Sequence, residues 1–435
     1  MAFSSNLVSA PPLDQPTFRS FWMGGYECTD QLNSFGNRVD FLHLTGHGQL
    51  QAEDYKQLLP FNIRTVREGI RWSQVEKRAY QYDWSTVSDM IDTGKACGIQ
   101  QLWDICHFGF PDDLTPLHPM FARRFAALCR AFVQFYRSKN PDETLIVTPV
   151  NEVSFLSWLG GDATGTAPYC NKQGWEVKYG LMRAYIEGTA AMKEIDSNIK
   201  IMSTEPLVNM VPPLDANRET VRWAKQAHDN QFQAMDMLCG RICPELGGSP
   251  AYLDLLGLNY YYNNQWVFGS GEFLPWVNKP FDARWRPLRS LLLEAYNRYR
   301  IPLLLSETSH PKEDRPLWLR YITDECAAVI DMDVPFAGVC LYPIIDRPDW
   351  DHLTPWHQAG LWDAELVEGQ PPRRVLYEPY ASELLVAQKK IEEAIRKNEQ
   401  RKLNSKDKDR DRKKVITDSF AGKPVYEIPP ISKIS

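Results

Sequence analysis

Two glutamates occupy positions where an acidic residue is costly unless chemistry uses it. Glu152 follows Asn151 at the end of an apolar run, "LIVTPV" at 145–150, and Glu307 ends a second run, "IPLLLSE" at 301–307. Glutamate is rarely buried without a partner, and perturbed carboxylates cluster at functional sites. Two carboxylates across one site can cleave a glycosidic bond, because one donates a proton to the leaving oxygen while the other attacks or activates water. Taken alone, Glu152 could equally mark the point where a strand meets solvent.

The two carboxylates would need different surroundings for this chemistry. The acid must stay protonated, through burial or through the negative charge of its neighbour, whereas the nucleophile must stay ionised beside a cation and hydrogen-bond donors. Arg67 and Tyr261 would suit the nucleophile. We expect the carboxyls of Glu152 and Glu307 to lie about 5 to 5.5 Å apart, the separation that gives retention through a covalent glycosyl-enzyme.

The elements that must position these residues follow an alternating pattern. Between Glu152 and Glu307, and on either side of them, amphipathic stretches with apolar residues every three or four positions separate short aliphatic or β-branched runs. Eight βα units within about 370 residues predict an α/β fold, a single closed (β/α)8 TIM barrel, more than an open doubly wound sheet. The predicted strands are 21–27, 64–70, 101–107, 145–152, 199–205, 253–261, 301–307 and 337–343.

Such a barrel would bring the ends of these strands together. Catalytic groups of (β/α)8 barrels lie at the C-terminal ends of the strands, where the βα loops form the open mouth. Almost every predicted strand ends on, or just before, polar or aromatic residues: Glu27, Gln31, Arg67, His107, Asn151, Glu152, Glu205, Asn259, Tyr261, Glu307, Tyr342, Asp346 and Asp349. We therefore expect Glu152 to face a pocket that it shares with other polar groups.

Length and composition set the remaining expectations. Of 435 residues, 43% are hydrophobic and 24% charged, as in an ordinary soluble globular protein, and no run reaches the roughly 18 apolar residues of a membrane helix. The start "MAFSSNLVSAPPLDQP" lacks a basic n-region and an apolar h-region, and nine cysteines at irregular spacing indicate reduced thiols. We expect a cytoplasmic protein with an N-terminal extension at 1–19, a barrel domain at 20–387, and a charged helix with a disordered tail at 388–435.

Charge is unevenly distributed along the chain. The net charge is -6, yet the segment from Lys389 to Lys414 contains twelve Lys or Arg against six Asp or Glu. An acidic body argues against nucleic acid as a partner, because nucleic-acid binding relies on a basic face. The basic segment could touch RNA or a membrane surface, but its mixed signs and lack of aromatics favour a solvated helix. No GxGxxG or GxxxxGK[ST] motif follows a strand. We expect a carbohydrate partner and no metal or organic cofactor, while the oligomeric state is not indicated.

Eight segments, in order, resemble motifs of glycoside hydrolase family 1, the β-glucosidase and β-galactosidase group within the clan of retaining (β/α)8 glycosidases. "FWMGGYECTDQ" is similar to F-x-x-G-x-x-x-S-x-x-Q, "TVREGIRWSQVE" to Y-R-F-S-I-x-W-S-R-I, "CHFGFPDDL" to Y-H-W-D-L-P-x-x-L and "VTPVNEVSF" to T-x-N-E-P. "GDATGTAP", "LDLLGLNYY", "PLLLSETSH" and "GVCLYPIIDRPDWD" stand where the family has G-Y-x-x-G-x-x-A-P, D-F-I-G-x-N-Y-Y, P-I-x-I-T-E-N-G and G-Y-x-x-W-S-L-L-D-N-F-E-W. Each match is loose, but their joint order is specific.

The resemblance implies a retaining β-glycosidase with Glu152 as acid/base and Glu307 as nucleophile. It implies that Asn151 holds the 2-hydroxyl of the sugar and that Arg67 and Tyr261 steady the nucleophile. Gln31 and His107 are implied to bind the non-reducing sugar, and Asp349 and Trp350 to contact its outer hydroxyls. Tyr261 and Tyr342 are also expected to contact the substrate. Simpler interpretations stay open: Arg67 as a barrel salt bridge, His107 as a core histidine, and Trp350 as a packing residue. Glu205 has no counterpart in the family motifs and is either a third pocket carboxylate or a capped strand end.

Several departures from the family pattern bear on substrate choice. Asp349 replaces a longer Glu and Tyr342 replaces a Trp, so the sugar pocket that these two residues would line is reshaped. The other departures are Phe108 and Gly109 for Trp-Asp, Ser309 for Gly, and Glu68 as an extra acid next to Arg67. Two further functions remain as alternatives: a transglycosidase that uses an acceptor other than water, and a non-catalytic barrel that binds sugars or a partner protein.

Overall fold

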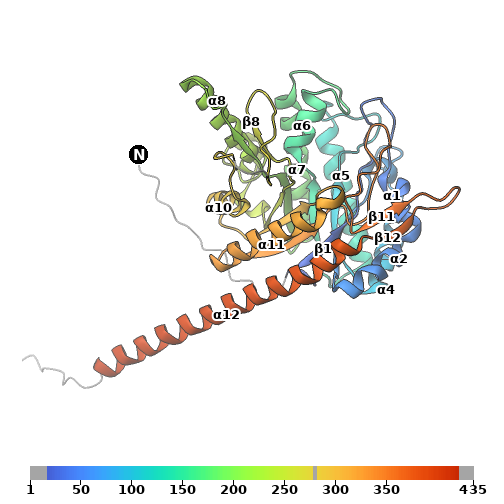
Figure 1. Ribbon diagram of the computed structural model, residues 1–435. Helices are drawn as coiled ribbons and strands as arrows, with labels where there is room; N and C mark the ends of the chain where they lie inside the picture. Colours follow the sequence, from blue (N-terminus) through green and yellow to red (C-terminus); the bar gives the residue numbers. More distant parts are fainter. Residues whose placement is uncertain (1–16, 278–281, 421–435) are drawn as a thin grey trace, which may run out of the picture.

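The chain folds into a closed barrel of eight parallel strands, seen in a computed structural model that describes residues 17–277 and 282–420 (Figure 1). Around the ring the strands follow chain order, and the ring closes where the last strand, β10, pairs with β1. Each of the eight predicted strands is confirmed, with ends that differ by no more than two residues. The strands are β1 (Trp22–Gly25), β2 (Thr65–Gly69), β3 (Gln100–Cys106), β4 (Ile146–Val150), β5 (Lys200–Pro206), β7 (Leu255–Asn259), β9 (Leu303–Thr308) and β10 (Phe336–Leu341).

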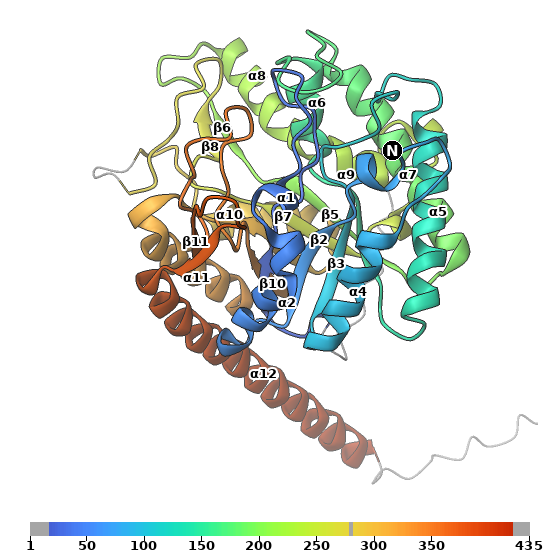
Figure 2. The ribbon, with the colours of Figure 1, turned by 90° about the vertical axis from the view of Figure 1, so that its right-hand side faces the viewer.

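Helices surround the barrel and fill the connections between strands (Figure 2). The α-helices are α1 (Phe41–Leu44), α2 (His47–Leu58), α3 (Trp72–Val75), α4 (Ser85–Cys97), α5 (Phe121–Lys139), α6 (Val153–Gly161), α7 (Gly174–Ile195), α8 (Arg218–Asp229), α9 (Gln233–Leu238), α10 (Leu288–Tyr299), α11 (Arg315–Asp331) and α12 (Glu378–Phe420). Short 3-10 turns are η1 (Leu59–Phe61), η2 (Asn230–Phe232), η3 (Pro244–Leu246), η4 (Pro250–Tyr252) and η5 (Lys312–Asp314). Two small sheets pair β6 (Asn209–Val211) with β8 (Gln265–Val267) and β11 (Trp362–Glu365) with β12 (Arg373–Leu376).

The barrel interior changes from apolar to polar along the strands. A buried apolar layer takes one residue from each of seven strands: Met23, Leu102, Ile146, Met202, Leu255, Leu304 and Cys340. Side chains on one face of a strand recur every second residue, so the next position on the same face lies two residues nearer the carboxyl end. Those positions hold Gly25, Asp104, Thr148, Thr204, Gly257, Ser306 and Tyr342. The apolar layer therefore closes the barrel below, and polar side chains occupy its interior above.

The last helix, α12, is anchored to the outside of the barrel along α11 (Figure 1). Its buried side chains recur every three or four positions, as one face of a helix requires: Tyr380, Leu384, Ala387, Ile391 and Ala394. Further on, the amide of the buried Asn398 donates to the backbone oxygen of Ile330 at 2.8 Å. The helix thus packs on the barrel beyond residue 388, and the expected boundary between the barrel domain and the charged helix stays a prediction.

Beyond Lys402 the backbone of α12 continues as helix and projects away from the barrel in both views (Figures 1 and 2). The start of the expected N-terminal extension, 1–16, and the end of the expected tail, 421–435, lie outside the described residues. Among the described helices, none combines the length and the apolar character that crossing a bilayer would demand. All nine cysteines are unpaired, which confirms the prediction of free thiols.

Candidate active site

Glu307 is held at the end of β9 by two donors, one on each carboxylate oxygen. Arg67 Nη1 donates to Oε1 at 2.6 Å, and the Tyr261 hydroxyl donates to Oε2 at 2.7 Å. The carboxyl is buried, so both bonds form away from bulk water, where charge-assisted hydrogen bonds are strong. The two residues predicted to steady this glutamate therefore contact it directly.

Arg67, on β2, links Glu307 to two more strands. Its guanidinium donates to Asp104 on β3 through Nε at 3.0 Å and Nη2 at 2.7 Å, and Nη2 also donates to Asn151 Oδ1 at 2.7 Å. Burial acts to lower the pKa of Arg67, but the charges of Asp104 and then Glu307 raise it well above its ordinary value. The permanent positive charge of Arg67 thus lies between Asp104 and Glu307. Breaking its pair with either acid would leave a buried charge without its partner.

Glu152 has a different environment from Glu307. It follows β4 and precedes α6, with a backbone φ of 44°, in the left-handed region that non-glycine residues seldom adopt. Its backbone N–H donates to Thr204 O at 2.8 Å, which fixes this conformation. The Asn259 amide donates to Oε1 at 2.8 Å, and Asn259 is oriented in turn by Ser306, whose hydroxyl donates to its Oδ1 at 2.6 Å.

The pKa of Glu152 lies well above its ordinary value. Burial is the largest cause, the negative charge of Glu307 is the next, and Glu205 adds to both, while the Asn259 hydrogen bond and Arg67 act in the opposite direction. Burial and the charge of Glu307 also raise the pKa of Tyr261, which keeps its hydroxyl protonated as a donor. The site therefore contains one carboxyl that favours its proton and one carboxylate that receives two strong donors.

The predicted sugar-binding residues His107, Asn151 and Tyr342 are neighbours in the barrel interior. Asp104 accepts from His107 Nδ1 at 2.8 Å, so His107 Nε2 faces the Asn151 amide at 3.2 Å and the Tyr342 hydroxyl at 3.4 Å. The rings of His107 and Tyr342 are stacked, with centroids 5.8 Å apart. The buried Glu27, whose Oε1 accepts from Thr29 and lies 3.6 Å from His107 Nε2, joins this group.

Gln31 and Trp350 each bring a polar atom that has no partner among the described residues. Gln31 is 1% exposed with its Oε1 unpaired, and Trp350 Nε1 is likewise buried and unpaired. Buried polar atoms almost always have a hydrogen-bond partner. A sugar hydroxyl can donate to an acceptor such as Gln31 Oε1 and can accept from a donor such as Trp350 Nε1. Trp350 also packs against Phe108 and Phe155, with ring centroids 5.6 and 6.0 Å away.

Asp349 lies in the loop after β10, beside Trp350, and stabilises that loop. Its Oδ1 accepts from the backbone N–H of Asp351 at 3.0 Å and of His352 at 2.9 Å, and its side chain is 37% exposed. The carboxyl thus caps a turn, and its predicted contact with the outer sugar hydroxyls stays a prediction.

Two acids left open by the sequence have defined partners. Glu205 Oε2 accepts from the Ser154 backbone N–H at 3.2 Å, at the N-terminus of α6. Glu68 follows Arg67 on β2, and because neighbours on a strand face opposite sides it meets the surrounding helices. There it accepts from His47 Nε2 at 3.0 Å and from the Tyr55 hydroxyl at 2.6 Å. Glu68 is therefore part of the outer packing of the barrel.

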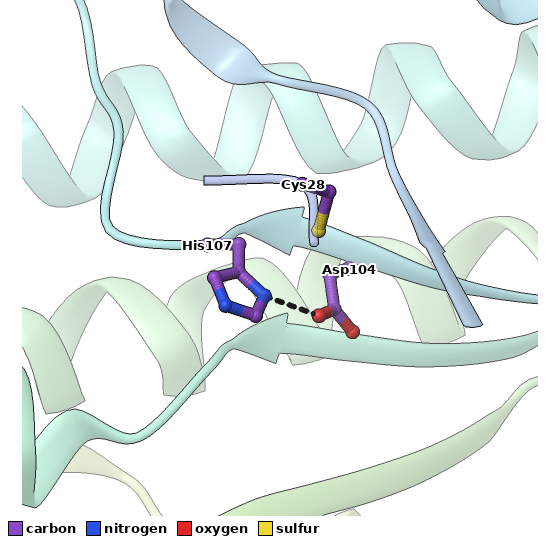
Figure 3. A group of neighbouring side chains, drawn as sticks. All are labelled: Cys28, Asp104 and His107. Carbon is purple, nitrogen blue, oxygen red and sulfur yellow. Dashed lines mark hydrogen bonds and ion pairs between the residues drawn. The ribbon is translucent and has the colours of Figure 1, made fainter. Parts of the chain in front are cut away.

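Cys28, Asp104 and His107 form a cluster whose ligand atoms all lie within 4.8 Å of one another (Figure 3). Cysteine, carboxylate and imidazole are metal ligands in proteins. Here Asp104 already receives both Arg67 and His107, and burial, with help from Asp104 and Glu27, raises the pKa of the Cys28 thiol well above its usual value. A metal ion would bind the thiolate form of Cys28, which the raised pKa disfavours. These contacts instead favour a role for Asp104 in orienting His107.

Sequence reasoning missed two residues that organise the site, Asp104 and Asn259. Asp104 orients both Arg67 and His107, and its position within the apolar run 101–107 was the available signal. Asn259 was recognised as a polar strand end but was given no role, whereas its amide bonds the carboxyl of Glu152.

The comparisons with known proteins concern the fold. No family model matches the sequence, and no curated protein matches it either. Among solved structures, a family 1 β-glucosidase from Thermotoga maritima superimposes with a TM-score of 0.67 at 15% identity, over 89% of this chain and 99% of that chain. The β-glucosidase of the same organism in complex with glucoimidazole gives 0.66 at 14%, over 88% and 99%. A hyperthermophilic β-glucosidase mutant gives 0.65 at 12%, over 84% and 99%. The resemblance indicated by the motifs is thus confirmed at the level of the fold: the chain has the (β/α)8 architecture of family 1 β-glucosidases.

Proposed function

We propose that the protein is a retaining β-glycosidase that cleaves a β-linked glycoside through a covalent glycosyl-enzyme. One observation carries the proposal: Glu307 receives an Arg67 guanidinium and a Tyr261 hydroxyl, whereas Glu152 receives an Asn259 amide and has a raised pKa. Opposite environments of this kind assign one carboxyl to proton donation and the other to nucleophilic attack. The fold shared with β-glucosidases supports the same assignment.

The reaction takes two steps. In the first, Glu307 forms a bond to the anomeric carbon while Glu152 gives its proton to the glycosidic oxygen, which leaves as the free aglycone alcohol. Covalent bonding consumes the negative charge of Glu307, so Glu152, now ionised, no longer faces that charge. In the second step Glu152 removes a proton from water, whose oxygen bonds to the anomeric carbon as Glu307 departs. The product keeps the original anomeric configuration.

The remaining residues bind and orient the sugar. Asn151, fixed by Arg67, is available to the 2-hydroxyl, and Gln31 and Trp350 offer an unpaired acceptor and an unpaired donor to the other hydroxyls. His107 and Tyr342 line the same interior position. No group in this scheme requires a cofactor, and the unpaired cysteines agree with the cytoplasmic location that we propose.

The experiment is a screen of nitrophenyl glycosides in the gluco, galacto, manno, fuco and xylo configurations, each in both anomers. We expect hydrolysis of at least one β-anomer, and Glu152→Gln and Glu307→Gln should each remove most of it. Glu325→Gln is the matched control, because Glu325 is as buried as Glu307 but accepts from the Arg289 backbone N–H at the start of α10. Rates near the wild type in either site variant would refute the assignment.

A trap with the 2-deoxy-2-fluoro analogue of the active glycoside tests the covalent step. Its glycosyl-enzyme breaks down slowly, so the peptide that contains Glu307 should gain the mass of one fluorosugar, in agreement with the retaining mechanism. If the whole panel gives neither hydrolysis nor labelling, the non-catalytic sugar-binding alternative replaces the proposal.

Glycosyl transfer to an alcohol is the second candidate, and aromatic side chains on the helix that follows Glu152 favour it. Phe155 and Trp158 lie on α6, the helix that begins directly after Glu152, with ring centroids 5.7 Å apart, and Trp158 is 53% exposed. An exposed aromatic on the helix that follows the acid/base could hold an acceptor sugar through its flat face. Analysis of products formed with added acceptor sugars distinguishes transfer from hydrolysis.

A further inference from the structure

The inference concerns Glu205, a buried carboxylate that the proposed mechanism does not use. It ends β5, next to Thr204, and is 3% exposed. Its Oε2 accepts from the backbone N–H of Ser154 at 3.2 Å. Since Ser154 lies in the first turn of α6 and Glu152 directly precedes that helix, Glu205 holds the backbone that positions the acid/base. A carboxylate at a helix N-terminus also interacts favourably with the free N–H groups there.

Among the described residues, Lys178 on α7 is a cation that acts on the carboxyl of Glu205. Burial, the largest cause, raises the pKa of Glu205, and the charge of Lys178 lowers it. Lys178 donates to Gln233 at 2.9 Å and so is oriented within the same region. The hydrogen bond from Ser154 likewise favours the ionised form of Glu205. Burial outweighs these two contributions, so the pKa of Glu205 lies above its ordinary value, and its ionised form depends on the cation and the backbone donor.

Glu152 is the group on which this charge acts. The charged or titratable groups that interact with Glu152 are Glu307 on β9, Glu205 on β5 and Arg67 on β2, together with Tyr261, whose pKa the charge of Glu152 raises. Tyr261 follows β7 and bonds Glu307. The first catalytic step converts Glu307 from an anion into a neutral ester, but Glu205 takes no part in the chemistry and keeps its charge.

We propose that Glu205 is a positioning residue for Glu152, which caps the helix that follows the acid/base and whose constant negative charge favours the protonated form of the acid/base. The proposal rests on the proposed function for its catalytic meaning. Glu205 would thus be a third carboxylate of the site, which positions Glu152 and does not react with the substrate. Two effects follow from one side chain, and they can be separated because glutamine keeps the hydrogen-bond acceptor and removes the charge.

The test is the pH dependence of kcat/KM in Glu205→Gln, measured on the glycoside found in the screen. The alkaline limb of the profile reports the loss of the Glu152 proton in the free enzyme. Removal of a neighbouring negative charge should move that limb to lower pH by about 0.5 to 1 unit. Glu325→Gln, the change already used as a control at a buried glutamate that caps α10, should leave the limb in place.

An unchanged alkaline limb in a folded, active Glu205→Gln variant overturns the proposal, because helix capping alone would not move it. If thermal unfolding shows that Glu205→Gln does not fold, Glu205→Met takes its place, because it removes the charge and fills the buried position with an apolar side chain of similar volume. The limb should again move to lower pH, and a limb that stays in place overturns the proposal.

A titration without substrate separates this proposal from the proposed function. Carbon-13 NMR of side-chain carboxyls in glutamate-labelled protein gives the Glu152 signal, identified by its loss in Glu152→Gln. Even if no glycoside is cleaved, the midpoint of that signal should fall in Glu205→Gln and stay fixed in Glu325→Gln. A midpoint that is equal in wild type and Glu205→Gln refutes the role of Glu205 whatever the activity.

Discussion

Replacement of Tyr261 by Phe removes one hydroxyl and leaves the ring. That hydroxyl donates to Glu307 Oε2 at 2.7 Å, a short hydrogen bond to a buried carboxylate. Hydrogen bonds to charged groups contribute about 1.5 to 3 kcal/mol. If the bond holds the nucleophile in the geometry of attack, its loss raises the barrier by a similar amount, which corresponds to a decrease of about 10- to 150-fold in kcat. Arg67 still holds Oε1, so the variant should fold and keep a KM within a few-fold of the wild type.

The neighbouring tyrosine provides a matched control. Tyr260 is fully buried, and its hydroxyl accepts from Gln265 Nε2 at 2.9 Å, on the outer side of the barrel. Tyr260→Phe deletes the same group from the same strand end, but this hydroxyl bonds Gln265, and the backbone bond from Tyr260 N–H to Glu307 O at 2.9 Å stays. Steady-state rates and the rate of fluorosugar labelling should both fall in Tyr261→Phe and hold in Tyr260→Phe. Equal losses in the two variants, or wild-type labelling in Tyr261→Phe, would refute a specific support of the nucleophile.

Two further predictions concern buried polar groups. Burial acts to lower the pKa of His47, but the charges and hydrogen bonds of Glu68 and Asp54 raise it from 6.5 to about 9. The folded state therefore binds the proton more tightly, and about 3 kcal/mol of stability, present below pH 6.5, should be lost as the pH rises through about 9. Urea unfolding across this range measures the loss, which should be absent in His47→Gln; parallel curves would contradict the assignment. Gln31→Leu should lower kcat/KM about tenfold or more, because a sugar hydroxyl loses its acceptor, while thermal stability holds or rises because an unpaired buried oxygen is removed. Unchanged kcat/KM would exclude Gln31 from the sugar site.

The strands were predictable because buried parallel strands are continuous apolar runs bounded by polar residues. The same property hid Asp104. Both faces of such a strand are covered, so the sequence does not tell which of two alternating sets of side chains faces the barrel interior. Glu68 and Arg67 are neighbours in the chain, yet Arg67 reaches Glu307 in the interior and Glu68 reaches His47 outside it.

Some residues of the candidate site could be predicted from the order of motifs in the sequence, whereas others could be found only from the folded geometry. Glu152, Glu307, Arg67 and Tyr261 were identifiable from motif order, and the contacts of Glu307 with Arg67 and Tyr261 agree with it. The helix cap made by Glu205 depends on the entry of α6 from a left-handed residue, and no local pattern announces that geometry. The roles of Asp349 and Trp350 in sugar binding, and the expected separation of the two catalytic carboxyls, stay predictions.

The attachment of α12 to α11 has a consequence for the order of events during synthesis. Every strand of the ring precedes α12 in the chain, so the ring can close before Tyr380, Leu384 and Ile391 have left the ribosome. Until these residues emerge, the apolar outer face of α11 stays exposed to solvent and can form non-native contacts with other nascent chains. An apolar face of the newly made protein therefore stays exposed late in translation, when Glu152 and Glu307 are already in place.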